Sequence, residues 1–254
     1  METNKIYQGD CKEIMKTFPA NCVDLTVTSP PYDNLRNYNG YDFDFMGIAD
    51  QLFRVTKQGG VVVWVVADAT IKGSETGTSF KQALYFKEIG FNLHDTMIWE
   101  KTGAGSVGSN LCYWQNFEYM FVFSKGRPKA LNLIEDRPNK SPGITTAHGS
   151  RGKDGVSKSK RKIMQKSTGR RFNLWKLPGS THPIHKATFP EKLANDHIIS
   201  WSNENDIVFD PMCGAGTTLK MAKINRRQFI GIDISEEYVN IAKQRCGITN
   251  SLIS

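Results

Sequence analysis

Six short apolar runs, many of them separated by helical patterns, constrain the fold of this chain more than any other feature. The runs cover residues 23–28, 60–67, 93–100, 117–124, 206–210 and 229–233. Runs of this length are typical of strands that are buried on both faces of a sheet. Segments with apolar residues at helical spacing lie at 42–57, 80–90, 190–202, 217–225 and 235–245. The sequence therefore predicts an α/β fold with helices on both faces of a mostly parallel sheet.

Residues 125–180 interrupt this alternation. The segment is rich in Gly, Pro, Ser, Lys and Arg and has little apolar periodicity. Stretches of that composition form loops more readily than buried strands or helices. We therefore predict one domain formed by residues 1–124 and 181–254, with residues 125–180 inserted into it as a loop-rich unit. A chain of 254 residues is long enough for such a domain with an insertion.

The positive charge of the chain is concentrated in one part of that insertion. The whole chain carries a formal net charge of +8 and has a pI near 9.2. Residues 151–171 contain nine Lys or Arg and one Asp, an excess equal to that of the whole chain. A basic segment of this kind predicts a polyanionic partner, nucleic acid above all. A solvated loop is the alternative.

The cysteines and the apolar runs argue against several other classes of protein. The chain has five cysteines, none in a C-x-x-C pair, so we expect reduced thiols and neither a disulfide framework nor a metal site. No apolar run approaches the ~20 residues of a membrane span. Residues 1–15 lack the basic and apolar pattern of a signal peptide. We therefore expect a cytoplasmic protein without a membrane partner.

The stretch DIVFDPMCGAGTTLKMA, residues 206–222, predicts a strand, a tight turn and a helix. Gly214 and Gly216 allow the backbone of the turn to come close to a ligand, and the start of the helix offers N–H groups to it. Asp233 ends another strand, seventeen residues after Gly216. A carboxylate at that place can accept hydrogen bonds from both hydroxyls of a ribose. The pattern predicts a cofactor that contains a nucleoside.

Two residues indicate which cofactor this is. Leu219 stands where the dinucleotide fingerprint G-x-G-x-x-G requires its third glycine. Asp210, at the strand end before the turn, would repel a phosphate but attract an amino group. S-adenosylmethionine has an amino group and a ribose but no phosphate, so it fits both residues. The alternative for Asp210 is a turn residue before Pro211, and Asp68, which follows the run 60–67, either faces the same site or caps the next segment.

A second unusual stretch, Ser29-Pro30-Pro31-Tyr32, follows the first apolar run. A residue before proline is restricted to extended backbone, which fixes Ser29 and Pro30. The Ser29 hydroxyl and the Pro30 carbonyl can then accept hydrogen bonds from an exocyclic amine, and Tyr32 can stack on a flat base. Holding that amine in line with a methyl sulfonium supplies most of the catalysis, without a metal or a covalent intermediate. A turn or a short polyproline segment is the alternative.

Together, TSPPY and DPMCGAGTT, residues 28–32 and 210–218, resemble motifs IV and I of amino-directed DNA methyltransferases, which methylate cytosine N4 or adenine N6. The catalytic motif precedes the cofactor motif, an order that resembles the β class, a circular permutation of the usual methyltransferase chain. The resemblance covers residues 4–246. It implies a Rossmann-like methyltransferase fold, S-adenosylmethionine as cofactor, and a target base that is flipped out of double-stranded DNA.

The resemblance assigns roles to individual residues. It makes Ser29, Pro30, Pro31 and Tyr32 catalytic. The cofactor-binding residues that it implies are Asp10, Thr28, Lys186, Phe189, Asp210, Pro211, Gly214, Gly216, Thr217, Thr218, Asp233 and Ile234. Asp10 corresponds to the acid that contacts the adenine amine. Lys186 and Phe189 belong to a segment that resembles motif X, with Thr188 where a proline often stands.

The insertion 125–180 would be the target-recognition region. The basic residues that we expect to bind DNA phosphates there are Lys158, Lys160, Arg161, Lys162, Arg170 and Arg171. Arg36, four residues after Tyr32, either meets a phosphate or is a surface residue. A cognate restriction endonuclease and a homodimer stay open as further partners. The permutation also predicts that the end of the last helix, 235–245, lies near residues 5–10.

The target base is a separate prediction. In the resembling family, Ser at the first position of the catalytic motif favours cytosine N4 and Asp favours adenine N6, so Ser29 predicts N4-methylcytosine. Adenine N6 is the alternative with the same chemistry. Methylation of an RNA base or a protein glutamine is less favoured, because related enzymes of that kind usually have Asn first and the opposite motif order. A DNA-binding protein without activity is less favoured because both motifs look intact.

Overall fold

The computed structural model describes residues 1–31, 43–103, 112–148, 161–179 and 189–248. The chain divides into a larger compact unit, formed by residues 1–132 and 173–254, and a smaller one, formed by residues 133–172. The smaller unit spans fewer residues than the predicted insertion 125–180, because the residues on either side of it belong to the larger unit.

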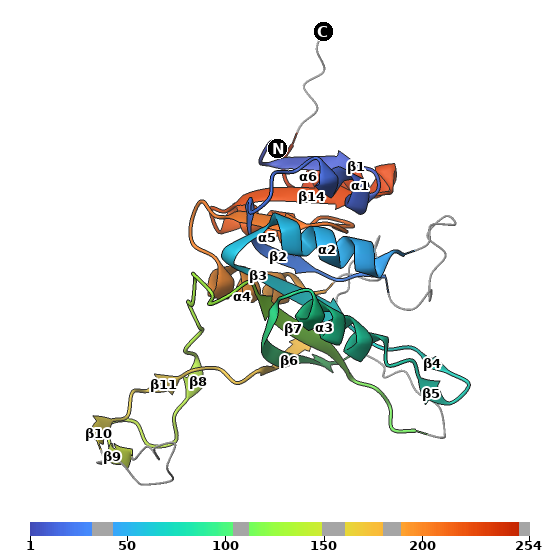
Figure 1. Cartoon of the computed structure of the whole chain (residues 1–254). Helices are drawn as coiled ribbons and strands as arrows, with labels where there is room; N and C mark the ends of the chain where they lie inside the picture. The colour runs from blue at the N-terminus through green and yellow to red at the C-terminus, as the bar shows by residue number, and fades with distance from the viewer. Residues whose placement is uncertain (32–42, 104–111, 149–160, 180–188, 249–254) are drawn as a thin grey trace. The chain divides into compact units, whose positions relative to one another are not determined.

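An eight-stranded sheet is the centre of the larger unit (Figure 1). In spatial order, its strands are β1 (Lys5–Gln8), β14 (Gln228–Asp233), β13 (Ile207–Asp210), β2 (Val23–Thr28), β3 (Thr56–Val66), β7 (Phe117–Ser124), β6 (Asn92–Thr102) and β12 (Leu174–Pro178). Within this sheet, β7 runs antiparallel to both of its neighbours and every other pairing is parallel. The mostly parallel sheet and the six strands predicted from the apolar runs are confirmed.

The sheet contains two edge strands that the apolar runs do not predict. β1 has four residues, and its ends, Lys5 and Gln8, are polar. β12 lies in the segment assigned to the insertion, and the structure corrects that assignment. Its side chains alternate, with Trp175 and Leu177 buried and the residues between and around them exposed. A strand that buries one face over five residues gives too weak a sequence pattern to stand out from a basic loop.

Helices pack on both faces of the sheet, as predicted. One apolar core lies under α1 (Cys11–Lys16), α2 (Phe45–Val55) and α3 (Thr78–Glu88), and the other under α4 (Glu191–Trp201), α5 (Thr217–Ile224) and α6 (Glu236–Arg245). Along β3, Val62 and Trp64 belong to the first core, whereas Val63 and Val65 belong to the second. A fully buried side chain of this size contributes ~1.5–3 kcal/mol. None of the helices in the described part of the chain has the length and apolar character that a membrane crossing requires.

The carboxyl ends of β1, β14, β13, β2 and β3 meet at one edge of the sheet, which we call the carboxyl edge. Asp210 and Asp233 end their strands there, and Ser29 directly follows β2. Asp10 follows β1 after a single glycine. Ligands of open α/β sheets bind at this edge, so the fold brings most of the predicted site residues to the expected place.

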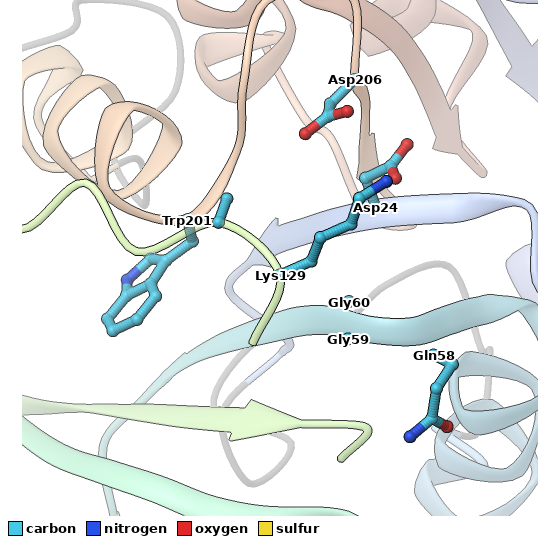
Figure 2. Close-up of a pocket in the computed structure, with 8 residues that line it drawn as sticks. Asp24, Gln58, Gly59, Gly60, Lys129, Trp201 and Asp206 are labelled. Carbon is cyan, nitrogen blue, oxygen red and sulfur yellow. The ribbon is translucent and has the colours of Figure 1, made fainter. Parts of the chain in front are cut away.

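A small cleft lies at the opposite edge, where β2, β3 and β13 begin (Figure 2). Asp24, Lys129, Trp201 and Asp206 are among the residues that line it. The Asp24 carboxylate accepts hydrogen bonds from Lys57 Nζ at 2.7 Å and from the backbone N–H of Ile207 at 3.0 Å. Asp24 therefore joins β2 to β3 and to β13. None of the predicted site residues that the structure describes lines the cleft.

The two ends of the larger unit lie close together. The N–H of Asn4 donates to the carbonyl of Phe229 at 2.7 Å, and this bond precedes the pairing of β1 with β14. Asn4 and Ile248 line the same hollow. For the described residues, this confirms the prediction that the last helix ends near the segment with which the chain begins.

The smaller unit contains two short antiparallel ladders. They pair β8 (Arg137–Pro138) with β11 (Thr168–Gly169) and β9 (Thr145–His148) with β10 (Arg161–Met164). Arg171 Nε donates to Asp136 Oδ1 at 3.0 Å, and Arg137 Nε donates to the carbonyl of Arg170 at 2.9 Å. Ile163 is half exposed, at 50%. Polar bonds therefore contribute much of what holds this unit together.

Candidate cofactor and active site

Asp210 and Thr28 join the two predicted motifs at the carboxyl edge. Thr28 Oγ1 donates to Asp210 Oδ1 at 2.7 Å, and both side chains are buried. The N–H of Met212 donates to the same oxygen at 3.2 Å, which is the turn role that the sequence allowed. Burial raises the pKa of the Asp210 carboxyl to about 6, although the hydrogen bond from Thr28 acts in the opposite direction. The attraction of this carboxyl for an amino group stays a prediction that this geometry permits.

Backbone hydrogen bonds, one of them to β14, hold the turn after Asp210. The N–H of Cys213 donates to the carbonyl of Ile232 at 2.9 Å, and the N–H of Gly216 donates to the carbonyl of Cys213 at 2.7 Å. Gly216 has φ +76°, and a Cβ added there would lie 2.8 Å from the Cβ of Ala242 on α6. The missing side chain of Gly216 thus makes room for α6, a function of this glycine that the sequence does not show.

Replacing Gly216 with alanine should destabilise the fold by roughly 2–4 kcal/mol, the sum of a left-handed backbone penalty and an overpacking penalty. Urea denaturation of the purified variant measures this loss. Gly73→Ala is the matched control, because Gly73 has φ +81° and no described atom within 4 Å of an added Cβ. Equal losses in the two variants would mean that the contact with α6 has no energetic weight.

Asp233 holds the turn from the neighbouring strand. Its Oδ2 accepts a hydrogen bond from the N–H of Gly214 at 2.7 Å, and its Oδ1 accepts one from the N–H of Ser235 at 2.9 Å. Burial raises the pKa of this carboxyl, while the backbone hydrogen bonds lower it. Each carboxylate oxygen can accept a second hydrogen bond. Asp233 can therefore support the turn and still bind the hydroxyls of a ribose.

Asp10 and Asp68 are helix-capping acids at the same edge. Asp10 Oδ1 accepts hydrogen bonds from the N–H groups of Lys12 at 2.8 Å and Glu13 at 3.3 Å, which caps α1. The N–H of Gly9 donates to the carbonyl of Asp233 at 2.9 Å, so Asp10 lies near the predicted ribose site. Asp68 Oδ1 accepts from the N–H of Ser79 at 2.8 Å, in the first turn of α3. Asp68 therefore has the capping role that the sequence allowed.

Three of the residues predicted to be catalytic lie directly after β2. Ser29 and Pro31 are half-buried and Pro30 is buried. Because Thr28 is bonded to Asp210, the position of Ser29 relative to the cofactor turn is set by the pairing of β2 with β13 and by that one side-chain bond. The predicted site residues Tyr32, Arg36, Lys158, Lys160 and Lys186 lie outside the described residues.

Four other predicted cofactor residues follow the strands that end at Asp210 and Asp233. Thr217 and Thr218 are buried at the start of α5, and Thr218 Oγ1 donates to the carbonyl of Val27 at 3.1 Å. Pro211 is buried and Ile234 is half-buried. Thr218 thus ties the start of α5 to β2, and this bond adds to the one between Thr28 and Asp210.

Phe189 approaches the site from a different segment. It is 8% exposed and belongs to the core under α4, α5 and α6. Pro190 follows it as the N-cap residue of α4, where no hydrogen bond from a described side chain caps the helix. The position of Phe189 therefore depends on how the start of α4 is held.

The predicted DNA-binding residues that the structure describes lie in the smaller unit. Lys162 is exposed on β10, and the Arg170 side chain is 72% exposed. Arg171 differs, because its guanidinium pairs with Asp136 and its side chain is 18% exposed. Arg161 begins β10. Lys162 and Arg170 are thus exposed to a partner, although Arg170 Nε also lies 4.0 Å from Glu135 Oε1, whereas Arg171 is largely buried within the unit.

Sequence reasoning missed two charged residues beside the cofactor turn. Arg245, the last residue of α6, donates to the carbonyl of Ala215, and it also donates to Glu191 at the start of α4. Arg245 lies outside the motifs IV, I and X, and Glu191 lies in the segment that resembles motif X but received no predicted role. The signal that could have found them is spatial, because each acts on a segment that is distant in sequence.

Comparison with known sequences identifies the family. The DNA methylase family, which comprises N6- and N4-directed methyltransferases, matches residues 23–244. The orphan methyltransferase M.BamHII of Bacillus amyloliquefaciens is 55% identical over 244 residues, 91% of each chain. The type II methyltransferase M.BglII of Bacillus subtilis is 27% identical over 264 residues, 95% of this chain and 68% of the relative.

Solved structures share the fold. The PvuII cytosine-N4-specific DNA methyltransferase superposes with a TM-score of 0.69 at 20% identity, over 100% of this chain and 89% of the other. A putative DNA modification methylase from Thermus thermophilus, in complex with S-adenosylmethionine, superposes with a TM-score of 0.66 at 23% identity, over 96% and 93% of the two chains. These likenesses confirm the Rossmann-like methyltransferase fold.

The carboxyl edge fits the cofactor of that fold. Asp10, Asp210 and Asp233 surround a glycine turn, and three carboxylates suit amino groups and ribose hydroxyls better than a phosphate. S-adenosylmethionine, which the sequence predicted, is the cofactor. The chain belongs to the DNA methylase family and is an S-adenosylmethionine-dependent DNA methyltransferase that acts on an exocyclic amine, cytosine N4 or adenine N6.

Proposed function

We propose that this enzyme transfers a methyl group to N4 of a cytosine that is flipped out of duplex DNA. The observation that carries the proposal is the buried hydrogen bond of 2.7 Å from Thr28 to Asp210. It fixes the segment that begins with Ser29 beside the cofactor turn. S-adenosylmethionine bound at that turn supplies an electrophilic methyl group. An amine held by Ser29 and Pro30 would lie in line with it, and such positioning lowers the barrier of a transfer between two bound groups.

The catalytic segment holds both hydrogens of the target amine. We assign the Ser29 hydroxyl as the acceptor of one and the carbonyl of Pro30 as the acceptor of the other. Pro30 and Pro31 have no N–H groups, so the backbone offers acceptors and no competing donors there. With both hydrogens engaged, the nitrogen lone pair is directed out of conjugation with the ring. A strong base is not needed, because the methylated ammonium loses its proton readily.

Ser29 supports cytosine as the target base. A neutral hydroxyl stabilises a developing positive charge on nitrogen less than the carboxylate that adenine N6 enzymes of the resembling family have at this position. Adenine offers a similar amidine-like edge, so the choice of base rests on Ser29 alone. Methylation of adenine N6 is the second candidate for the same site.

The direct test is chemical analysis of DNA from a methylation-free host that expresses the protein. The DNA is digested to nucleosides, which are separated and identified by mass spectrometry. We expect N4-methylcytosine in the host with the active protein and none in a host with the Ser29→Ala variant. N6-methyladenine would contradict the proposed base and leave the enzyme class intact. If the protein binds S-adenosylmethionine but the DNA contains neither product, duplex DNA alone is not its substrate, and the proposal is contradicted.

The smaller unit supports a role in DNA binding. It contains 11 Lys or Arg and three Asp or Glu, a net charge of +8. The larger unit holds the remaining 22 Lys or Arg and 22 Asp or Glu, so it is neutral. We assign the smaller unit as the target-recognition unit. The antiparallel ribbon of β9 and β10, which presents Lys162, has the form of element that enters a DNA major groove.

Reversing the charge of Lys162 and Arg170 together, each to Glu, should weaken DNA binding at least tenfold and lower the salt slope by about 2, since each lost phosphate contact removes ~0.9 from it. Fluorescence anisotropy with a labelled duplex at several salt concentrations measures both quantities. Lys87→Glu with Arg226→Glu is the control of equal charge change, on exposed residues of the larger unit. An unchanged slope in the first variant would identify the basic segment as a solvated loop.

Two further features of the proposed function follow from the substrate and the relatives. Methylation of duplex DNA supports a cytoplasmic protein, and the relatives named above are bacterial. A relative of 55% identity is described as an orphan methyltransferase. We therefore favour an enzyme that acts without a cognate restriction endonuclease, and we propose no homodimer.

A further inference from the structure

Arg245 is bonded to the cofactor turn from the last residue of α6. One of its terminal nitrogens, Nη1, donates to the carbonyl of Ala215 at 2.7 Å and to Thr217 Oγ1 at 3.3 Å. Ala215 and Thr217 flank Gly216, whose backbone lies against Ala242 of the same helix. The Arg245 side chain is 17% exposed. Its guanidinium therefore fixes both sides of the turn through an atom of each flanking residue.

The other terminal nitrogen of Arg245 reaches a different helix. Nη2 donates to Glu191 Oε1 at 2.8 Å, and the same oxygen accepts a hydrogen bond from Lys220 Nζ at 2.7 Å. Glu191 is the first residue of α4 and stands two residues after Phe189. The hydrogen bond from Lys220, with the neighbouring positive charges, lowers the pKa of the Glu191 carboxyl. One carboxylate oxygen thus joins α4, α5 and α6.

These contacts connect two segments that the proposed function assigns to the cofactor. One is the turn that contains Gly214 and Gly216, and the other is the segment that ends with Phe189. Pro190, the N-cap residue of α4, has no polar side chain that could cap the helix, so the contacts of Glu191 tie the start of α4 to the turn through Arg245. A guanidinium has five donors in a rigid plane and can hold two partners at a fixed angle, which a lysine ammonium on a flexible stem does not do.

We propose that Arg245 and Glu191 form a clamp that sets the spacing between the cofactor turn and the start of α4, and thereby the affinity for S-adenosylmethionine. Arg245 is a positioning residue, because it acts through the turn and contacts no reacting atom. The proposal rests on the assigned cofactor site, but it does not depend on which base is methylated. Loss of the clamp leaves the bond from Thr28 to Asp210 in place, and with it the position of Ser29, so the chemical step of the bound complex should be preserved.

The test compares Arg245→Met with the matched variant Arg226→Met. Methionine keeps most of the apolar stem of arginine and removes the donors. Arg226 is an exposed arginine that pairs with Glu204 at 3.5 Å and precedes β14, at the edge of the sheet opposite to the turn. Calorimetric titration gives the Kd for S-adenosylmethionine without DNA, and steady-state methylation gives kcat and both KM values. Because the titration contains no DNA, failure of the proposed DNA target would not alter it.

We expect Arg245→Met to raise the Kd and the KM for S-adenosylmethionine roughly tenfold, which corresponds to ~1.4 kcal/mol. At saturating cofactor, kcat and the KM for DNA should stay within about twofold of the parent. Arg226→Met should match the parent in all of these quantities. Arg245→Lys should restore no more than a small part of the affinity, since one ammonium cannot hold both partners.

Two further measurements test the clamp even if Arg245→Met folds poorly. Glu191→Gln is the milder variant, and it should raise the Kd in the same direction by a smaller factor. In the double variant the two effects should not add, because both changes break one network. A fall in kcat with unchanged KM, a lower melting temperature with unchanged Kd, full rescue by Arg245→Lys, or additive effects would each overturn the clamp.

Discussion

Replacing Asp233 with alanine should weaken the binding of S-adenosylmethionine by roughly 100-fold. We propose that the carboxylate accepts hydrogen bonds from two ribose hydroxyls, and hydrogen bonds to a charged group contribute ~1.5–3 kcal/mol each. The same change removes the acceptors of the Gly214 and Ser235 N–H groups, so the turn loses support as well. Calorimetric titration of the purified variant with S-adenosylmethionine measures the change in Kd.

Asp206→Ala is the matched control for this experiment. Asp206 lies at the start of β13, at the opposite edge of the sheet, and its Oδ2 accepts a hydrogen bond from the N–H of Asn203 at 2.7 Å. The control therefore loses a comparable support of the backbone without touching the carboxyl edge. A Kd for Asp233→Ala that equals that of Asp206→Ala would remove Asp233 from the cofactor site.

Replacing Ser29 with alanine should lower kcat by a factor on the order of 10², the size of effect seen when one hydrogen-bonding group of a preorganised active site is removed. The change deletes one of the two acceptors that we propose for the target amine. The Kd for S-adenosylmethionine should change by less than about twofold, because Asp210 still receives the bond from Thr28. Single-turnover methylation of a labelled duplex at saturating enzyme separates the chemical step from binding.

Ser74→Ala serves as the control, since Ser74 is an exposed serine on the hairpin of β4 (Thr70–Ile71) and β5 (Ser74–Glu75), which follows β3. We expect it to have the kcat of the parent. If Ser29→Ala instead raised the Kd for S-adenosylmethionine and left kcat at saturation intact, the division between a catalytic segment and a cofactor turn would be wrong.

The fold was predictable where the sequence pattern is local and strong. Central strands such as β3 are buried on both faces, so an apolar run such as GVVVWVVA leaves few alternatives. The edge strands β1 and β12 are different, because each is stabilised by one neighbour and needs few apolar residues. Trp175 and Leu177 are the buried residues of β12, and two such residues beside a basic segment do not distinguish a strand from a loop.

The site was predictable to the extent that a side chain and its partner lie in a motif. Asp210, Asp233 and Ser29 stand at strand ends in motifs, and the structure brings them to one edge. The packing role of Gly216 requires Ala242, and the role of Arg245 requires the carbonyl of Ala215, a residue distant in sequence. A backbone carbonyl has no signature in the sequence, and a glycine does not indicate which residue packs against it. Neither contact can therefore be predicted from the sequence alone.

The pairing of β1 with β14 determines when during synthesis this enzyme can exist. Lys5 lies opposite Ile230, and Gln8 lies opposite Asp233, so β1, which is made before the other strands of this sheet, waits for β14, which is made after them. Thr26 likewise waits for Phe209. Contacts of such long sequence separation form late, because the intervening chain must first be closed into a loop. The nascent protein therefore cannot complete the carboxyl edge that binds its methyl donor until β14 has been synthesised.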